Sequence, residues 1–104
     1  MPYDIRQRSS IYEIRDEIQV LLAYQPQVFE FSLEGIECLT LKEIGVLLFA
    51  QRLAKEYGTK IELSECNQDV IAFLGTLGLL NNFVIHFSAE KLQEINLLPF
   101  WQHK

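Results

Sequence analysis

Residues 28–57, VFEFSLEGIECLTLKEIGVLLFAQRLAKEY, carry a strand, a turn and a helix in succession. In the first part, polar residues alternate with apolar ones, which is the pattern of a strand that buries one face. The apolar face of this strand consists of Phe29, Phe31 and Leu33. Glu34-Gly35 then predicts a turn or bulge. We expect residues 36–39 to continue the extended chain.

Residues 41–57 are predicted to form a helix, with Lys55 in its last turn and Gly58 as its stop. Successive residues of an α-helix are rotated by 100°, so five apolar residues lie on one face and form the predicted core stripe. They are Val46, Ala50, Leu53, Ala54 and Tyr57. The opposite, water-facing side carries Gln51, Arg52 and Lys55.

Three apolar residues near the start of this helix, Leu41, Ile44 and Leu48, project on the same side as the polar residues. Exposed helix surfaces usually avoid such a patch unless something covers it. Two interpretations follow. Neighbouring loops bury the first half of the helix on all sides, or the patch binds a partner.

Upstream of residue 28, Ser10-Ile11-Tyr12-Glu13 is a capping-box pattern that starts another helix. Its apolar residues recur at helical spacing, and the helix should stop before Pro26. These residues are Ile11, Ile14, Ile18, Leu21 and Leu22. Residues 3–6 are a candidate extra edge strand.

Downstream, residues 60–63 form a predicted strand that ends near Cys66, and Asn67 is a good N-cap for a third helix. Gly78 stops that helix, whose apolar residues are Val70, Phe73, Leu74 and Leu77. Residues 83–87 are an apolar strand. Ser88 caps a last helix, which carries Leu92, Ile95 and Leu98 and ends at Pro99.

Helices and strands therefore alternate with short connections, which indicates βαβ units. The predicted fold class is α/β, with a small, open, mostly parallel sheet and right-handed crossovers. The 104 residues suit one domain.

Composition excludes several classes of protein. Half of the residues (49%) are hydrophobic, which argues against intrinsic disorder, and the net charge of −5 argues against nucleic acid as the main partner. The first ten residues are polar, so we expect no secretory signal there, and no apolar run approaches the ~20 residues that cross a bilayer. We expect a cytoplasmic protein in which Cys38 and Cys66 are reduced.

Residues that would support catalysis are not in recognisable arrangements. Residues 75–78, Gly-Thr-Leu-Gly, lack the Lys-Ser/Thr ending of a phosphate loop and fit a helix stop instead. His86 reads as a structural histidine within a strand, and His103 as a solvated residue of the tail. No His/Cys spacing suits zinc, and no Gly-x-Ser-x-Gly elbow is present. The prediction is a protein without enzymatic activity, cofactor or metal.

A different hypothesis is a small-ligand binder for a nucleotide, an anion or a lipid. Open parallel sheets bind ligands at the carboxyl ends of their strands. The candidate ligand-binding residues there are Cys38, Ser64, Cys66 and Asn67, together with Thr40.

Two stretches resemble a STAS domain, the family named for sulfate transporters and anti-sigma factor antagonists. They are FSLEGIECLTLKEIGVLL (residues 31–48) and EYGTKIELSECNQDVIAFLGTLGLLNNFVI (residues 56–85). The family pattern is an apolar strand, a turn, Asp-Ser-Ser-Gly-Leu-Gly, and a helix rich in Val and Leu. Residues 31–37 match the strand and turn, residues 44–48 match the helix start, and Leu77-Gly78-Leu79 matches the last motif.

The chain departs from the family at two places. Lys42 stands where the phosphorylatable serine is expected, and Thr40 stands at the aspartate. Lysine cannot take that serine's role, so the usual phosphorylation switch is not expected, and Thr40 is interpreted as a helix cap. The family also begins with a strand pair, for which this chain has one short strand at most.

The resemblance implies a non-catalytic regulatory module whose partner surface is the start of the second helix with its adjacent loops. The candidate partner-binding residues are Thr40, Leu41, Lys42, Ile44, Gly45 and Leu48. The implied partners are an anti-sigma kinase-like protein or the ATPase of a lipid-type ABC transporter. A homodimer is a further hypothesis, because an exposed sheet edge invites pairing.

Overall fold

The computed structural model describes residues 2–7 and 10–88. Their elements follow in the order β1 (Tyr3–Asp4), η1 (Ile5–Gln7), α1 (Ile11–Ala23), β2 (Val28–Ser32), α2 (Leu41–Tyr57), β3 (Lys60–Cys66), α3 (Gln68–Thr76), η2 (Leu80–Asn82) and β4 (Val84–Phe87). The helix predicted after Ser88 lies outside the described residues.

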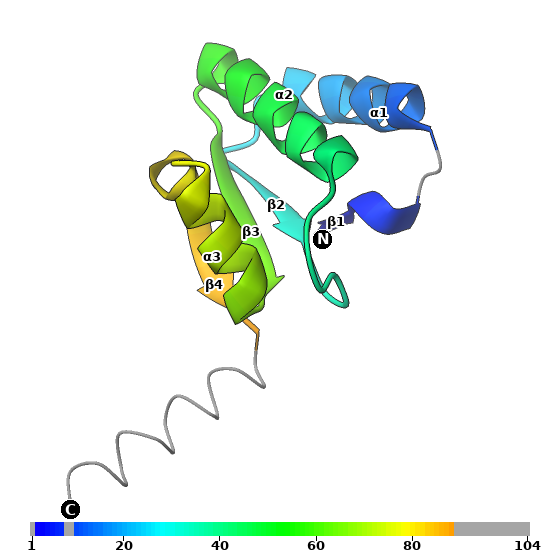
Figure 1. The fold of residues 1–104 in the computed structure, drawn as a ribbon. Coiled ribbons are helices and arrows are strands. Elements are labelled where there is room, and N and C mark those ends of the chain that lie inside the picture. Colours follow the sequence, from blue (N-terminus) through cyan, green and yellow to red (C-terminus); the bar gives the residue numbers. More distant parts are fainter. Residues whose placement is uncertain (1, 8–9, 89–104) are drawn as a thin grey trace, which may run out of the picture.

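The four strands form one sheet in the order β1-β2-β3-β4, and every neighbouring pair is parallel. Right-handed crossovers between strands in sequential order place all connecting helices on the same face. Figure 1 shows α1, α2 and α3 together on one side of the sheet. The predicted parallel α/β architecture is confirmed, with one layer of helices on one layer of strands.

The two faces of the sheet differ in polarity. Toward the helices, the central strands present buried side chains, namely Phe29, Phe31, Ile61 and Leu63. Toward the other face they present half-exposed polar ones, such as Glu30 and Glu62. His86 of β4 lies on that face with its Nε2 3.2 Å from Glu62 Oε1. Because the second face is polar, it requires no covering layer.

Local caps set the helix ends where the sequence predicts them. The Ser10 hydroxyl accepts from the backbone N–H groups of Tyr12 and Glu13, and Gly58 ends α2 with φ at 70°. Asn67 Oδ1 accepts from Val70 N at 2.7 Å and starts α3. These signals lie within three residues of the ends that they cap, which is why sequence alone locates them.

Residues 36–39 do not continue the extended chain, so that prediction is wrong. Gly35 takes φ of 78°, and Ile36 N donates to Leu33 O at 3.1 Å, which closes a turn. A side chain at position 35 would also collide with the Arg6 guanidinium. From the β3–α3 connection, Asn67 Nδ2 donates to Ile36 O at 3.0 Å and holds the loop. The conformation of this loop therefore depends in part on a residue that lies 31 positions later in the sequence.

Strand β3 continues beyond the alternating residues 60–63 and ends at Cys66, near the predicted end. The register against β4 shifts between Leu63 and Cys66, and Glu65 takes a left-handed φ of 57°. This irregularity breaks the two-residue alternation that marks a strand in a sequence. Pairing nevertheless resumes at Cys66, opposite Phe87.

Candidate functional site

Helix α2 packs along α1 and against β3, whereas it makes few contacts with α3. Its buried residues are Ile44, Val46, Leu47, Ala50 and Ala54. Ile44 is only 8% exposed, so its predicted position on the water side is wrong. Because α2 packs against both α1 and β3, a larger part of its circumference is buried than a single apolar stripe would cover. Ile44 lies at the margin of this buried part.

The remaining side of α2 carries an exposed stripe at alternating spacings of four and three residues. We call Leu41, Gly45, Leu48, Arg52 and Lys55 the α2 stripe. Leu41 is 87% and Leu48 is 38% exposed. The described loops therefore leave Leu41 and Leu48 uncovered at the start of the helix.

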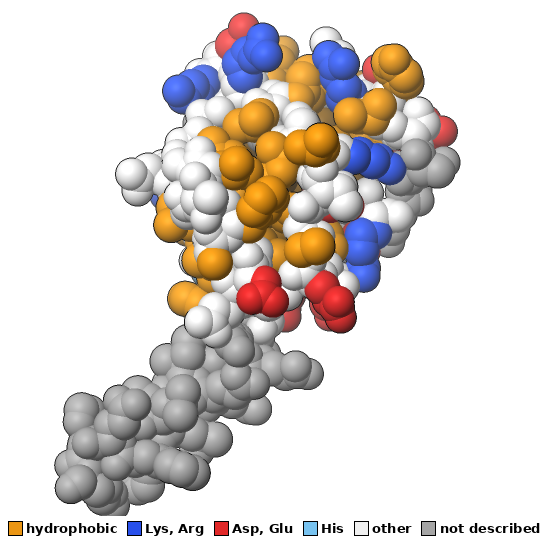
Figure 2. Space-filling view, in the orientation of Figure 1, with side chains coloured by type: hydrophobic (Ala, Val, Ile, Leu, Met, Phe, Trp, Pro, Cys, Tyr) orange, Lys and Arg blue, Asp and Glu red, His pale blue; other side chains and the backbone are white. Residues whose placement is uncertain are grey.

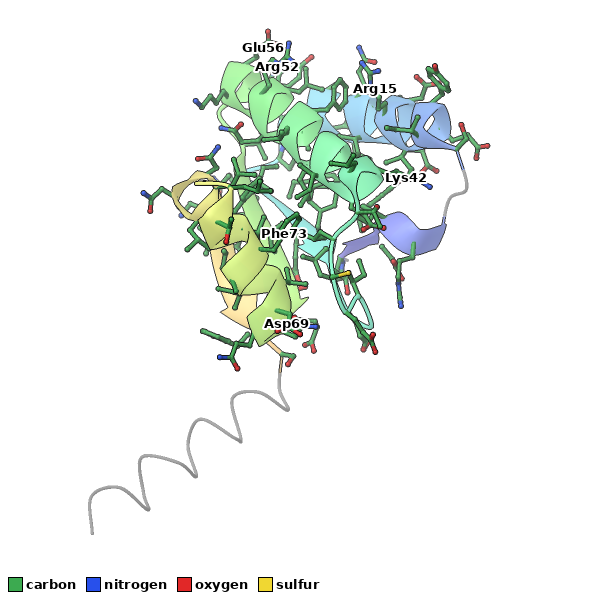
Figure 3. All side chains as sticks on the ribbon, in the orientation of Figure 1. Arg15, Lys42, Arg52, Glu56, Asp69 and Phe73 are labelled. Atoms are coloured by element: carbon green, nitrogen blue, oxygen red, sulfur yellow. The ribbon has the colours of Figure 1, made fainter. Side chains whose placement is uncertain are left out.

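Helix α3 contributes a second row, in which Asp69, Phe73 and Leu77 follow one another at intervals of four residues. In Figure 3, Phe73 lies on the side of α3 that faces α2. Phe73 is half-buried, and Leu77 is 45% exposed. The sequence analysis named both residues among the apolar residues of this helix without assigning them to a surface. They follow the charged Asp69 by four and eight residues, and this spacing, which puts all three on one side of a helix, was the available sign of a partly exposed row.

Figure 2 shows hydrophobic side chains gathered over α2 and α3 on one face of the molecule. We call this surface the α2–α3 face, defined by Leu41, Gly45, Leu48, Phe73 and Leu77. Charged residues stand at its borders. Arg52 lies near the end of α2, and Asp69 lies at the start of α3 (Figure 3).

The start of α2 is held by a reciprocal capping box. Thr40 N donates to Glu43 Oε1 at 2.7 Å, and Glu43 N donates to Thr40 Oγ1 at 3.4 Å. The interpretation of Thr40 as a cap is confirmed. Lys42 lies between these two residues and is half-buried.

We expect Thr40→Ala to lower the free energy of unfolding by about 0.5–2 kcal/mol, because the backbone N–H of Glu43 loses the hydroxyl that accepts its hydrogen bond. Urea unfolding measures the loss. Thr76→Ala is the matched control, since the Thr76 hydroxyl bonds only to the Ala72 carbonyl within α3. An equal loss in both variants would contradict the capping role.

Most of the candidate ligand-binding residues at the carboxyl ends of the strands make hydrogen bonds within the fold. The hydroxyl of Ser64 donates to Phe31 O at 3.3 Å, and Asn67 caps α3 and holds the 36–37 loop. The Cys66 thiol is fully buried, lies 3.6 Å from Leu63 O, and has its pKa raised by burial to about 11. Cys38 is exposed. The backbone thus engages three of these four side chains.

A hollow of about 480 Å³ does lie at the carboxyl edge of the sheet, and Glu34, Glu37, Glu65, Asn67 and Ser88 help to line it. Among the described residues, no buried side-chain polar atom lacks a hydrogen bond. The same residues contain no group of three His, Cys, Asp or Glu that could hold a metal ion. Three of the side chains that line the hollow are carboxylates, so its lining is acidic.

None of the described helices is both long and apolar enough to cross a membrane.

Comparison with known proteins supports the fold. No family profile matches the chain. No curated protein sequence matches it either. The crystal structure of a candidate anti-sigma factor antagonist from Thermotoga maritima superimposes with a TM-score of 0.64 at 14% sequence identity. The match covers 89% of this chain and 78% of that one. The fold is therefore STAS-like.

Proposed function

We propose that this chain, on the framework of an anti-sigma antagonist fold, is a non-catalytic interaction module of STAS type. Its α2–α3 face, together with Thr40 and Lys42 at the start of α2, docks a regulatory or transporter protein. Two partner classes fit the proposal, an anti-sigma kinase-like protein and an ABC-transporter ATPase.

Gly45 is the observation that carries the proposal. It lies inside α2, between Leu41 and Leu48 on the exposed stripe, where glycine costs a helix about 1 kcal/mol relative to alanine. Nothing in the described fold requires glycine here. A Cβ at this position would meet no atom within 4 Å, and Gly45 is not among the residues with positive φ. Close approach of a partner to the helix backbone explains the residue.

The surroundings of Gly45 suit protein contact. Leu41 and Leu48 supply apolar area on both sides of it, and Phe73 adds an aromatic ring of the kind enriched in binding hot spots. The fold neighbour supports the same reading, since it is described as a candidate anti-sigma factor antagonist.

We further propose that serine phosphorylation at the start of α2 does not switch the module. Lys42 stands at the position that the family resemblance gives to the phosphorylated serine. The Thr40 hydroxyl is engaged by Glu43 N, and the Glu43 carboxylate beside it would repel a phosphate.

The test uses a photo-crosslinking amino acid in place of Leu48, in cells, followed by recombinant binding of the captured protein. We expect Gly45→Ala to weaken that binding at least about tenfold while raising the thermal midpoint of the free chain. Leu48→Glu should weaken binding by a similar factor.

Ala72→Leu is the matched control, because Ala72 is exposed on α3 but outside the row of Asp69, Phe73 and Leu77. It should bind as the wild type does. Unchanged affinity in folded Gly45→Ala and Leu48→Glu would refute this face as the docking surface.

A further inference from the structure

A second surface lies at the other end of the sheet from β4, where β1 is the edge strand. Two adjoining hollows share Tyr3 and Leu21, and the larger has a volume of about 460 Å³. We call them together the β1-edge groove, lined among others by Tyr3, Val20, Leu21, Tyr24, Val28 and Glu30. None of these residues belongs to the α2–α3 face.

The groove combines exposed apolar side chains with acidic ones. Tyr24 is 81% exposed, and Val20 and Val28 are 59% and 46% exposed. Asp16, Glu17 and Glu30 also line the hollows, and Glu17 accepts a hydrogen bond from the Tyr3 hydroxyl at 2.5 Å. No Lys or Arg of the described residues lines them.

Strand pairing is incomplete beside this groove. All five residues of β2 pair with β3, but β1 pairs only with Phe31 and Ser32. Among the described residues, Val28, Phe29 and Glu30 therefore have a strand on one side only. Open strand edges of this kind accept extended segments from other chains.

We propose that the β1-edge groove docks an extended segment of a partner protein, in which apolar and basic residues alternate. A strand laid beside the start of β2 points successive side chains to opposite faces of the sheet. On the helix side they would meet Leu21 and Tyr24, and on the polar side they would meet Glu30.

Charge decides between this occupant and a second copy of the chain. A two-fold contact joins the same surface patch of both copies. It would set the acidic residues of one groove against those of the other, which is unfavourable. Basic residues in a partner segment complement the same groups.

The probes are three end-capped hexapeptides that share alternating valines, with the intervening residues all lysine, all glutamate or all serine. In titrations followed by ¹H–¹⁵N spectra, we expect the lysine peptide to shift amides in residues 20–24 and 28–30. It should bind at least about tenfold more tightly than the glutamate peptide, and added salt should weaken it.

Tyr24→Ser should weaken binding of the lysine peptide about tenfold. Tyr12→Ser is the matched control, because Tyr12 lies on the same helix, is 73% exposed and lines neither hollow. It should leave binding within about twofold of the wild type. Both tyrosines are exposed, so dispersed spectra should show an intact fold in each variant.

Three results would overturn the proposal. The first is that the lysine peptide shifts no amide of the groove, and the second is that it binds no more tightly than the glutamate peptide. The third is that Tyr24→Ser and Tyr12→Ser lose affinity for the lysine peptide equally. Light scattering that shows a dimer dissociated by Tyr24→Ser but not by Tyr12→Ser would assign the groove to a second copy. Gly45 and Leu48 lie outside the groove. None of these results therefore bears on the proposed function, which is tested separately with the variants of those two residues.

Discussion

Ile44→Glu is expected to lower the free energy of unfolding by about 3–5 kcal/mol. Ile44 is 8% exposed and belongs to the core cluster between the helices and the sheet. The change removes buried apolar area and places a carboxylate among apolar neighbours without a partner. Since small domains are stable by only about 5–15 kcal/mol, much of the total is lost.

Leu48→Glu, one helical turn further on, should change the same free energy by less than about 1 kcal/mol, because Leu48 is 38% exposed. The two variants introduce the same residue into the same helix, so helix propensity contributes only the small difference between the replaced Ile and Leu. Thermal unfolding followed by circular dichroism at 222 nm measures both. Similar losses would mean that α2 presents a different side to the sheet.

Phe31→Ala is the second substitution with a large expected effect, a loss of about 3–5 kcal/mol. Phe31 is fully buried on β2, and its ring centroid lies 5.1 Å from that of Phe29 and 5.9 Å from that of Tyr3. Its removal leaves a cavity and breaks both edge-to-face ring contacts. The Tyr3–Phe31 contact joins β1 to the core, so β1 should loosen first.

Denaturant unfolding measures this loss, and hydrogen exchange at Tyr3 and Asp4 reports on β1. Phe87→Ala is the control, because Phe87 is 39% exposed on the edge strand β4 and should cost less than half as much. A loss for Phe31→Ala no larger than for Phe87→Ala would contradict the central position of Phe31.

The two proposed surfaces lie on different parts of the fold. The α2–α3 face belongs to the helix layer, and the β1-edge groove lies where α1 meets the open edge of the sheet. A protein with both could hold two partners at once. Gly45→Ala and Tyr24→Ser then separate the two interactions in one chain.

Part of the candidate site was predictable from the sequence. The positions of Leu41, Gly45 and Leu48 on one side of α2 follow from the 100° turn per residue. Whether Ile44 joins them depends on how far α1 and β3 wrap around the helix, which is a property of packing. The contribution of Phe73 and Leu77 requires knowing that α3 lies beside α2 without close contact.

Helix ends could be located from the sequence, through caps such as Ser10, Thr40, Asn67 and Gly58. The sequence also indicated the parallel sheet, through strands that alternate with helices over short connections. These signals involve residues that are close together in the sequence, so they can be recognised without knowledge of the fold.

Other features depend on long-range contacts and follow from the packed fold. The loop at residues 36–39 is held by Asn67, β3 is prolonged by pairing with β4, and β1 covers only the last two residues of β2. The rotation of α2, which buries Ile44 and exposes Leu48, follows from two neighbours packing against it at once. Such contacts join residues far apart in the chain, and no local pattern encodes their geometry.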